Sequence, residues 1–257
     1  MLWLSFAFAV IIMSLGWLWQ KKRQNAGVVD VLWAFGLSIL ALFYAVTGEG
    51  TLWLKWLAGL MMSMWYVRLG MHLAKRVFGS EEEGRYRYLR QYWGTRADTY
   101  YFWFFQFQAL LVWAFTLPIY IITNSQTADF GWFHGLAVMV FISAFIGVTA
   151  ADYQLKRFVN DPTNRGQVCE DGLWYYSRHP NYFFEWLHWF TYPLLAIGLA
   201  AGQWLWLAPV VMWLFLYFIT GIPYTEKQAL RSRGEAYRSY QKTTSPFIPW
   251  RKKHVAD

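Results

Sequence analysis

The chain has 257 residues, of which 57% are hydrophobic, 22% are aromatic and only 15% are charged. Soluble domains carry about 25% charged residues, so this composition argues against an ordinary water-soluble protein. The net charge of +8 would suit a nucleic-acid partner, but the placement of the basic residues explains the excess in another way, and we expect no nucleic acid.

Seven apolar blocks follow one another along the chain, each close to the roughly 20 residues that cross a bilayer as a helix. They are residues 2–19, 28–46, 52–73, 100–122, 132–151, 182–199 and 204–222. This pattern predicts an all-α integral membrane protein with seven transmembrane helices in a single domain over residues 1–257. The last two blocks are separated only by a short turn at residues 200–203.

The basic residues lie almost entirely on one side of these predicted helices. They fall in residues 20–27, 75–99, 152–181 and the tail after Gly221, whereas only Lys55 falls on the other side and Arg68 lies within the third block. Cytoplasmic segments of membrane proteins carry an excess of Lys and Arg. We therefore predict that the N-terminus lies outside and the C-terminus in the cytoplasm.

Several familiar sites are missing from the sequence. Cys169 is the only cysteine, which excludes disulfides and zinc sites built on cysteine pairs. Glu185 and His188 form an ExxH element, but a di-iron site in a helix bundle needs further Glu ligands and a second such element. We therefore expect no metal.

Polar residues within the predicted membrane helices are candidate functional residues, because charged groups are costly in a bilayer. Asp30 lies near the start of the second block, and Arg68 and His72 share one face of the third. Asp30 could equally pair with Arg23 or with a neighbouring membrane-spanning helix, and Arg68 could extend to the interface. The residues expected to line one polar cavity open to the cytoplasm are Asp30, Tyr66, Arg68, Asp152 and Glu185.

The strongest local motif is GLWYYSRHPNYFFEW, residues 172–186. Pro180 suits the first turn of a helix. Arg178, His179 and Asn181 would then lie at a helix N-terminus, where free N–H groups and the helix dipole favour an anion. The alternative interpretation is an ordinary basic flank of a membrane helix. The basic amphipathic tail, residues 226–250, would fold over the same face or lie on the membrane surface.

Through this motif and several others, the chain resembles the bacterial branch of the steroid 5α-reductase family. The resemblance covers most of residues 28–250 and includes VVDVLWAFG, RLGMHLAKR, ADYQLKRF, the Pro-x-x-Glu element at 223–226 and AYRSYQKTTSPFIPW. Weaker similarity extends to sterol reductases and to isoprenylcysteine carboxyl methyltransferases, which share an Arg-His-Pro-x-Tyr element. The resemblance implies a multi-pass protein, here expected in the bacterial cytoplasmic membrane.

The family reaction is NADPH-dependent reduction of a carbon–carbon double bond conjugated to a ketone in a lipid such as a 3-oxo steroid. The resemblance implies that a carboxylic acid and a tyrosine stabilise the enolate oxygen. Asp30 matches the acid, where animal members carry Glu, and Tyr66 matches the tyrosine, with Trp65 as the alternative position. A carboxyl group in apolar surroundings can stay neutral and donate a hydrogen bond.

The resemblance further implies that residues 151–250 mainly bind the cofactor, NADPH, and that Arg85 binds the adenosine phosphate. The residues assigned to the cofactor in this way are Arg85, Asp152, Asn160, Arg165, Tyr176, Arg178, His179, Asn181, Tyr182, Glu185, Glu226, Tyr237 and Tyr240.

Two other functions stay open at this point. One is a methyltransferase that uses S-adenosylmethionine on a lipid or a prenylated cysteine, and the other is a lipid-binding or assembly protein without catalysis. The expected substrate is a steroid or another ring or prenyl lipid. The sequence does not determine the oligomeric state, and a monomer is one of the states that it allows.

Overall fold

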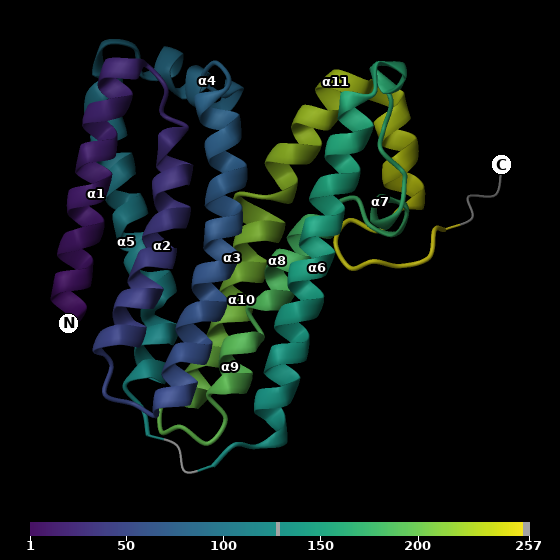
Figure 1. The fold of residues 1–257 in the computed structure, drawn as a ribbon. Helices are drawn as coiled ribbons and strands as arrows, with labels where there is room; N and C mark the ends of the chain where they lie inside the picture. The colour runs from purple at the N-terminus through teal and green to yellow at the C-terminus, as the bar shows by residue number, and fades with distance from the viewer. Residues whose placement is uncertain (127–128, 254–257) are drawn as a thin grey trace. The chain divides into compact units, whose positions relative to one another are not determined.

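The computed structural model describes residues 1–126 and 129–253, and the regular elements in these ranges are helical (Figure 1). One isolated β-bridge joins Ser177 and Ser245. The chain forms two compact units. Unit 1 comprises Met1–Ala128 and Gly198–Ala201, and unit 2 comprises Asp129–Ile197 and Gly202–Asp257.

Unit 1 is a bundle of long helices in which α2 and α5 each contact the other three. The long helices are α1 (Leu2–Arg23), α2 (Val28–Thr47), α3 (Leu52–Phe78) and α5 (Ala97–Thr123), and the short α4 (Gly84–Trp93) and η1 (Gly94–Arg96) join α3 to α5. Small residues bring α2 and α3 close together, since a Cβ at Gly59 would lie 2.5 Å from the Cβ of Ala45. Close approach at small residues is typical of helices that pack within a membrane.

Two pairs of buried hydroxyl groups fix the register of unit 1. Ser38 on α2 and Ser63 on α3 lie 2.7 Å apart, and Ser5 on α1 lies 2.5 Å from the Tyr44 hydroxyl on α2. Buried hydroxyl groups without partners are costly. These pairs therefore favour one alignment of the three helices.

Unit 2 is built along one long helix, α6 (Trp132–Asn160), which contacts α7, α8 and α9. Close packing of α6 on α8 depends on Gly147, because a Cβ there would lie 2.3 Å from the Phe184 ring. The other elements are η2 (Pro162–Asn164), α7 (Leu173–Tyr176), α8 (Pro180–His188), α9 (Thr191–Leu195), η3 (Gly202–Trp206), α10 (Leu207–Leu214), the π-helical η4 (Phe215–Ile219) and α11 (Ile222–Thr243).

The described chain has five helical segments long and apolar enough to cross a membrane. They are Leu2–Arg23, Val28–Thr47, Gly84–Thr123, Trp132–Asn160 and Gly202–Thr243. The third predicted block corresponds to α3, which has 27 residues but is less apolar, because it contains Lys55, Arg68 and His72.

The sixth predicted block is not one continuous helix. It divides into α8, with 9 residues, and α9, with 5 residues. Pro193 gives a physical reason, because its ring would clash with the carbonyl of Trp189 in a continuous α-helix and its nitrogen cannot donate. The expected single helix over residues 182–199 is therefore wrong.

Candidate functional site

A buried arginine, Arg178, connects three segments of unit 2. It follows Ser177, whose extended backbone separates α7 from α8. Its Nε donates to Glu226 Oε1 at 2.7 Å, and its Nη1 donates to the carbonyl oxygens of Gln241 at 3.0 Å and Thr244 at 2.6 Å. Only 9% of the side chain is exposed. Arg178 thus holds the start and the end of α11 against the junction of α7 and α8.

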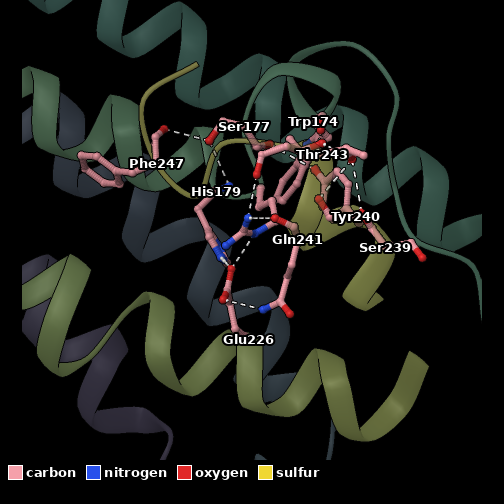
Figure 2. Close-up of polar contacts among 11 residues, drawn as sticks. Trp174, Ser177, His179, Glu226, Ser239, Tyr240, Gln241, Thr243 and Phe247 are labelled. Atoms are coloured by element: carbon pink, nitrogen blue, oxygen red, sulfur yellow. Dashed lines mark hydrogen bonds and ion pairs between the residues drawn. The ribbon is translucent and has the colours of Figure 1, made fainter. Parts of the chain in front are cut away.

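Glu226 is the common acceptor of this network, and Figure 2 shows its carboxylate between His179 and Gln241. Gln241 Nε2 donates to Oε2 at 2.8 Å, and His179 Nε2 lies 3.3 Å from Oε1. Burial lowers the pKa of His179, and the hydrogen bond to Glu226 opposes this only in part. The imidazole is therefore neutral at pH 7, and it stacks on the Tyr182 ring at 5.3 Å.

The tail segment, residues 244–250, lies beside the motif and is bonded to it mainly through backbone groups. The Arg178 N–H donates to the Ser245 carbonyl at 2.8 Å, and the Ser177 hydroxyl donates to the Phe247 carbonyl at 2.8 Å. Phe247 itself is buried. Its ring contacts the rings of Phe183, Trp186 and Tyr217.

Tyr237 and Tyr240 come from the second half of α11 and are both buried. The Tyr240 hydroxyl donates to the carbonyl oxygens of Trp174 and Ser177. The Tyr237 ring contacts the Tyr240 ring at 5.8 Å. The two tyrosines predicted from the tail therefore lie together where α11 packs on the junction of α7 and α8.

A second polar group of unit 2 lies between α6 and α8. Asn181 Nδ2 is 3.5 Å from Asp152 Oδ1, and its Oδ1 accepts from the Tyr182 N–H at 3.0 Å. Glu185 lies one helical turn after Asn181 and so shares its face of α8. All four side chains are partly buried. The structure thus brings Asp152 and Asn181 together, with Glu185 on the same helix face as Asn181.

The remaining predicted cofactor residues of unit 2 are exposed. Asn160 is the last residue of α6, and Arg165 follows η2. Tyr176 is 46% exposed at the end of α7, and its carbonyl accepts from the Trp250 N–H at 2.9 Å. These three residues lie on the surface of unit 2.

The two predicted catalytic residues and Arg85 belong to unit 1. Asp30 accepts a hydrogen bond from Arg85 Nη2 and one of 2.9 Å from the Tyr86 hydroxyl. Arg85 also lies 3.2 Å from Glu83 through its Nε. The partners of Asp30 therefore lie on α4, the short helix that joins α3 to α5, and the pairing with Arg23 that the sequence allowed is not observed.

Tyr66 is fully buried on α3, and its ring contacts the Trp33 ring of α2 at 5.6 Å. From the pairing of Ser38 with Ser63, Tyr66 is level with residue 35 of α2. At a rise of 1.5 Å per residue, that level is about 8 Å along the helix from Asp30.

The family comparison covers nearly all of these residues. The chain matches the model of DUF1295, described as a protein of unknown function, over residues 16–244. The chain belongs to the DUF1295 family. The matched range includes every candidate residue from Asp30 to Tyr240 and ends where the tail segment begins. No curated protein and no solved structure matched the chain.

Sequence reasoning missed several members of the site in this DUF1295 protein. Ser177, Gln241 and Thr244 hold Arg178 or its neighbours through contacts that no sequence period reveals. In the described residues, no three His, Cys, Asp or Glu side chains are grouped so that they could hold a metal ion. The polar groups offered by unit 2 are amides, hydroxyls and carboxylates around a buried arginine.

Proposed function

We propose that this protein is an NADPH-dependent membrane reductase that reduces a carbon–carbon double bond conjugated to a ketone in a ring or prenyl lipid, such as a 3-oxo steroid. One observation carries the proposal. Residues that the family resemblance assigns to the cofactor come from distant parts of the chain, yet Arg178, His179 and Glu226 form one network in unit 2.

The topology that we propose has seven membrane-crossing segments, with the N-terminus outside and the C-terminus in the cytoplasm. In this arrangement α3 is a crossing segment despite its polar residues, and α8 with α9 forms a broken one. Broken helices at membrane depth occur where they line a site or are buried in protein. The tail and the connector after α6 then lie on the cytoplasmic side, where soluble cofactors are found.

The residues of unit 2 suit a phosphate-bearing dinucleotide. The exposed cations Lys156, Arg157 and Arg165 would attract its phosphates. Asn181 and Tyr182 supply an amide and a phenol, and the Arg178–Glu226 pair holds α11 in place behind them. NADPH supplies the hydride when it is bound.

In unit 1, Asp30 and Tyr66 would donate hydrogen bonds to the ketone oxygen of the substrate. Negative charge develops on the ketone oxygen as the β-carbon receives hydride, and donors aimed at that oxygen lower the barrier. The Tyr66 hydroxyl is such a donor. Asp30 can act in the same way only in its protonated form.

The test is NADPH oxidation by detergent-purified protein, with and without a ring ketone that carries a conjugated double bond. We expect substrate-dependent oxidation with a reduced product. The Tyr66→Phe variant should lose turnover about 100-fold or more, as for loss of one oxyanion donor, while NADPH affinity is retained. The Tyr44→Phe variant is the matched control, because Tyr44 is equally buried but bonds to Ser5.

One observation favours a second function. Arg178, His179, Pro180 and Tyr182 keep the Arg-His-Pro-x-Tyr element shared with isoprenylcysteine carboxyl methyltransferases. A protein that binds S-adenosylmethionine in the same preparation and does not bind NADPH would be assigned to that class. Binding of neither cofactor would leave the non-catalytic lipid-binding role.

A further inference from the structure

The end of unit 1 at which α1 terminates contains a surface pocket of about 410 Å³. Its wall is formed by the turn after α1 and by the segment that leads into α4. Charged residues dominate it, with Arg23, Arg87 and Arg90 facing Glu81 and Glu82. The volume falls within the range of small-ligand sites, about 300–1,000 Å³.

Part of this charge is already used in a buried ion pair at the base of the pocket. Arg90 donates to Glu82 at 2.7 and 3.1 Å, and Glu82 also accepts from the Ala26 N–H at 2.8 Å. Only 7% of the Glu82 side chain is exposed. This pair therefore holds the pocket in shape and offers little net charge to a ligand.

The two other arginines are more available. Arg87 Nη2 donates to Glu81 Oε2 at 2.9 Å, and both side chains are exposed. Arg23 forms no hydrogen bond or ion pair within the part of the chain that the structure describes, although each of the nearby Arg76, Arg85, Arg87 and Arg90 has a carboxylate partner. Three arginines against two glutamates leave one positive charge, carried chiefly by Arg23.

The position of the pocket indicates what the ligand is. Arg23 is the last residue of α1, a helix long and apolar enough to cross a membrane. Trp19, one turn earlier, contacts Phe78 at 5.7 Å, and aromatic residues at the ends of crossing helices lie at the level of the lipid headgroups. The residue after Arg23, Gln24, has a left-handed backbone with φ 52° that ends α1 at the pocket, as is common at helix C-termini.

We propose that this pocket binds the phosphodiester headgroup of an anionic phospholipid with a single negative charge, of the phosphatidylglycerol type. Arg23 and Arg87 donate to the phosphate oxygens, as arginine does with its paired N–H groups. The carboxylate of Glu81 disfavours a headgroup with a second negative charge. This site is independent of the proposed reductase activity and requires only that α1 cross the membrane.

The test is native mass spectrometry of the detergent-purified full chain with added phosphatidylglycerol, phosphatidylethanolamine or phosphatidylcholine. We expect one phosphatidylglycerol to bind in preference to the other two. Arg23→Gln and Arg87→Gln should each weaken its binding about tenfold. Lys22→Gln is the matched control, because it removes the same charge from an exposed neighbour outside the pocket, and it should leave binding unchanged.

Three results would overturn the proposal. Equal binding of the three lipids would indicate a non-selective lipid shell, and an equal loss in Lys22→Gln and Arg23→Gln would indicate general attraction by surface charge. The third result is displacement of bound phosphatidylglycerol by soluble glycerol phosphate at a comparable concentration, which would show that the pocket binds a free phosphate and not a membrane lipid. Thermal unfolding of each variant would establish that these exposed substitutions leave the fold intact.

Discussion

Replacing Arg178 by alanine should loosen α11 and the tail segment from unit 2. The substitution removes the bonds to Glu226 and to two carbonyl oxygens and leaves Glu226, with 16% of its side chain exposed, without its arginine. Removal of one partner from a buried ion pair costs about 3–5 kcal/mol. We take about 3 kcal/mol, since Gln241 and His179 still contact Glu226. Each 1.4 kcal/mol is a factor of ten, so local opening should become about 100-fold more frequent.

Cys169 offers a direct assay, because it is the only cysteine and is 7% exposed. Its neighbour Val168 packs against Tyr237 and Tyr240 of α11, and burial raises the pKa of its thiol. Modification by a maleimide should therefore be slow in the intact protein and should follow the opening equilibrium.

The matched control is Arg238→Ala, which removes an exposed pair with Glu235 on the same half of α11. Exposed pairs contribute about 0–1 kcal/mol, so this variant should react at nearly the wild-type rate. If Arg178→Ala reacts no faster than Arg238→Ala, then the bonds of Arg178 do not hold α11 against unit 2.

Two further predictions concern other parts of the fold. Gly234→Ala should lower the stability of α11 by about 1–3 kcal/mol, because Gly234 interrupts the helix with φ 51° and ψ −123°. Circular dichroism during thermal unfolding would measure the change. An unchanged unfolding transition would contradict the prediction. Glu82→Gln should destabilise unit 1 by up to about 3 kcal/mol, because the partly buried Arg90 then loses its carboxylate partner. Glu81→Gln, at an exposed position, should change the unfolding temperature little. Equal effects of these two glutamate substitutions would show that burial does not decide their roles.

The apolar pattern predicts much of the fold because a bilayer leaves the backbone few choices. The blocks at 2–19 and 28–46 became α1 and α2 with small changes at their ends. The block at 182–199 divides after His188. Pro193 was visible in the sequence, but a proline alone does not predict a break, because α5 continues through Pro118.

The candidate site was predictable only in its residue types. A helix start at Pro180 follows from local chemistry, and α8 does begin there. The pairing of Arg178 with Glu226, 48 positions away, depends on how α11 returns to the motif, which no local pattern encodes. For the same reason Arg178, predicted as a ligand for an anion, has Glu226 as its partner in this structure.

The proposed roles of Asp30 and Arg85 meet in one ion pair. Arg85 and Tyr86 both donate to the Asp30 carboxylate. A carboxylate held in this way accepts hydrogen bonds and cannot donate one to an enolate. A phosphate that binds Arg85 would compete with Asp30 for the same guanidinium group. Binding of the cofactor would then be coupled to release of Asp30 from this ion pair.

This coupling makes a specific prediction for Arg85→Gln. If Arg85 binds the phosphate on the adenosine ribose, the variant should lose about tenfold in NADPH affinity and almost nothing in NADH affinity, since NADH lacks that phosphate. Arg87→Gln should change neither, because Arg87 pairs with Glu81 and not with Asp30. Fluorescence titration of both dinucleotides would measure the four affinities. If Arg85→Gln binds NADPH as tightly as the wild type, Arg85 serves only as the partner of Asp30, and the phosphate must be held by other cations such as Arg165.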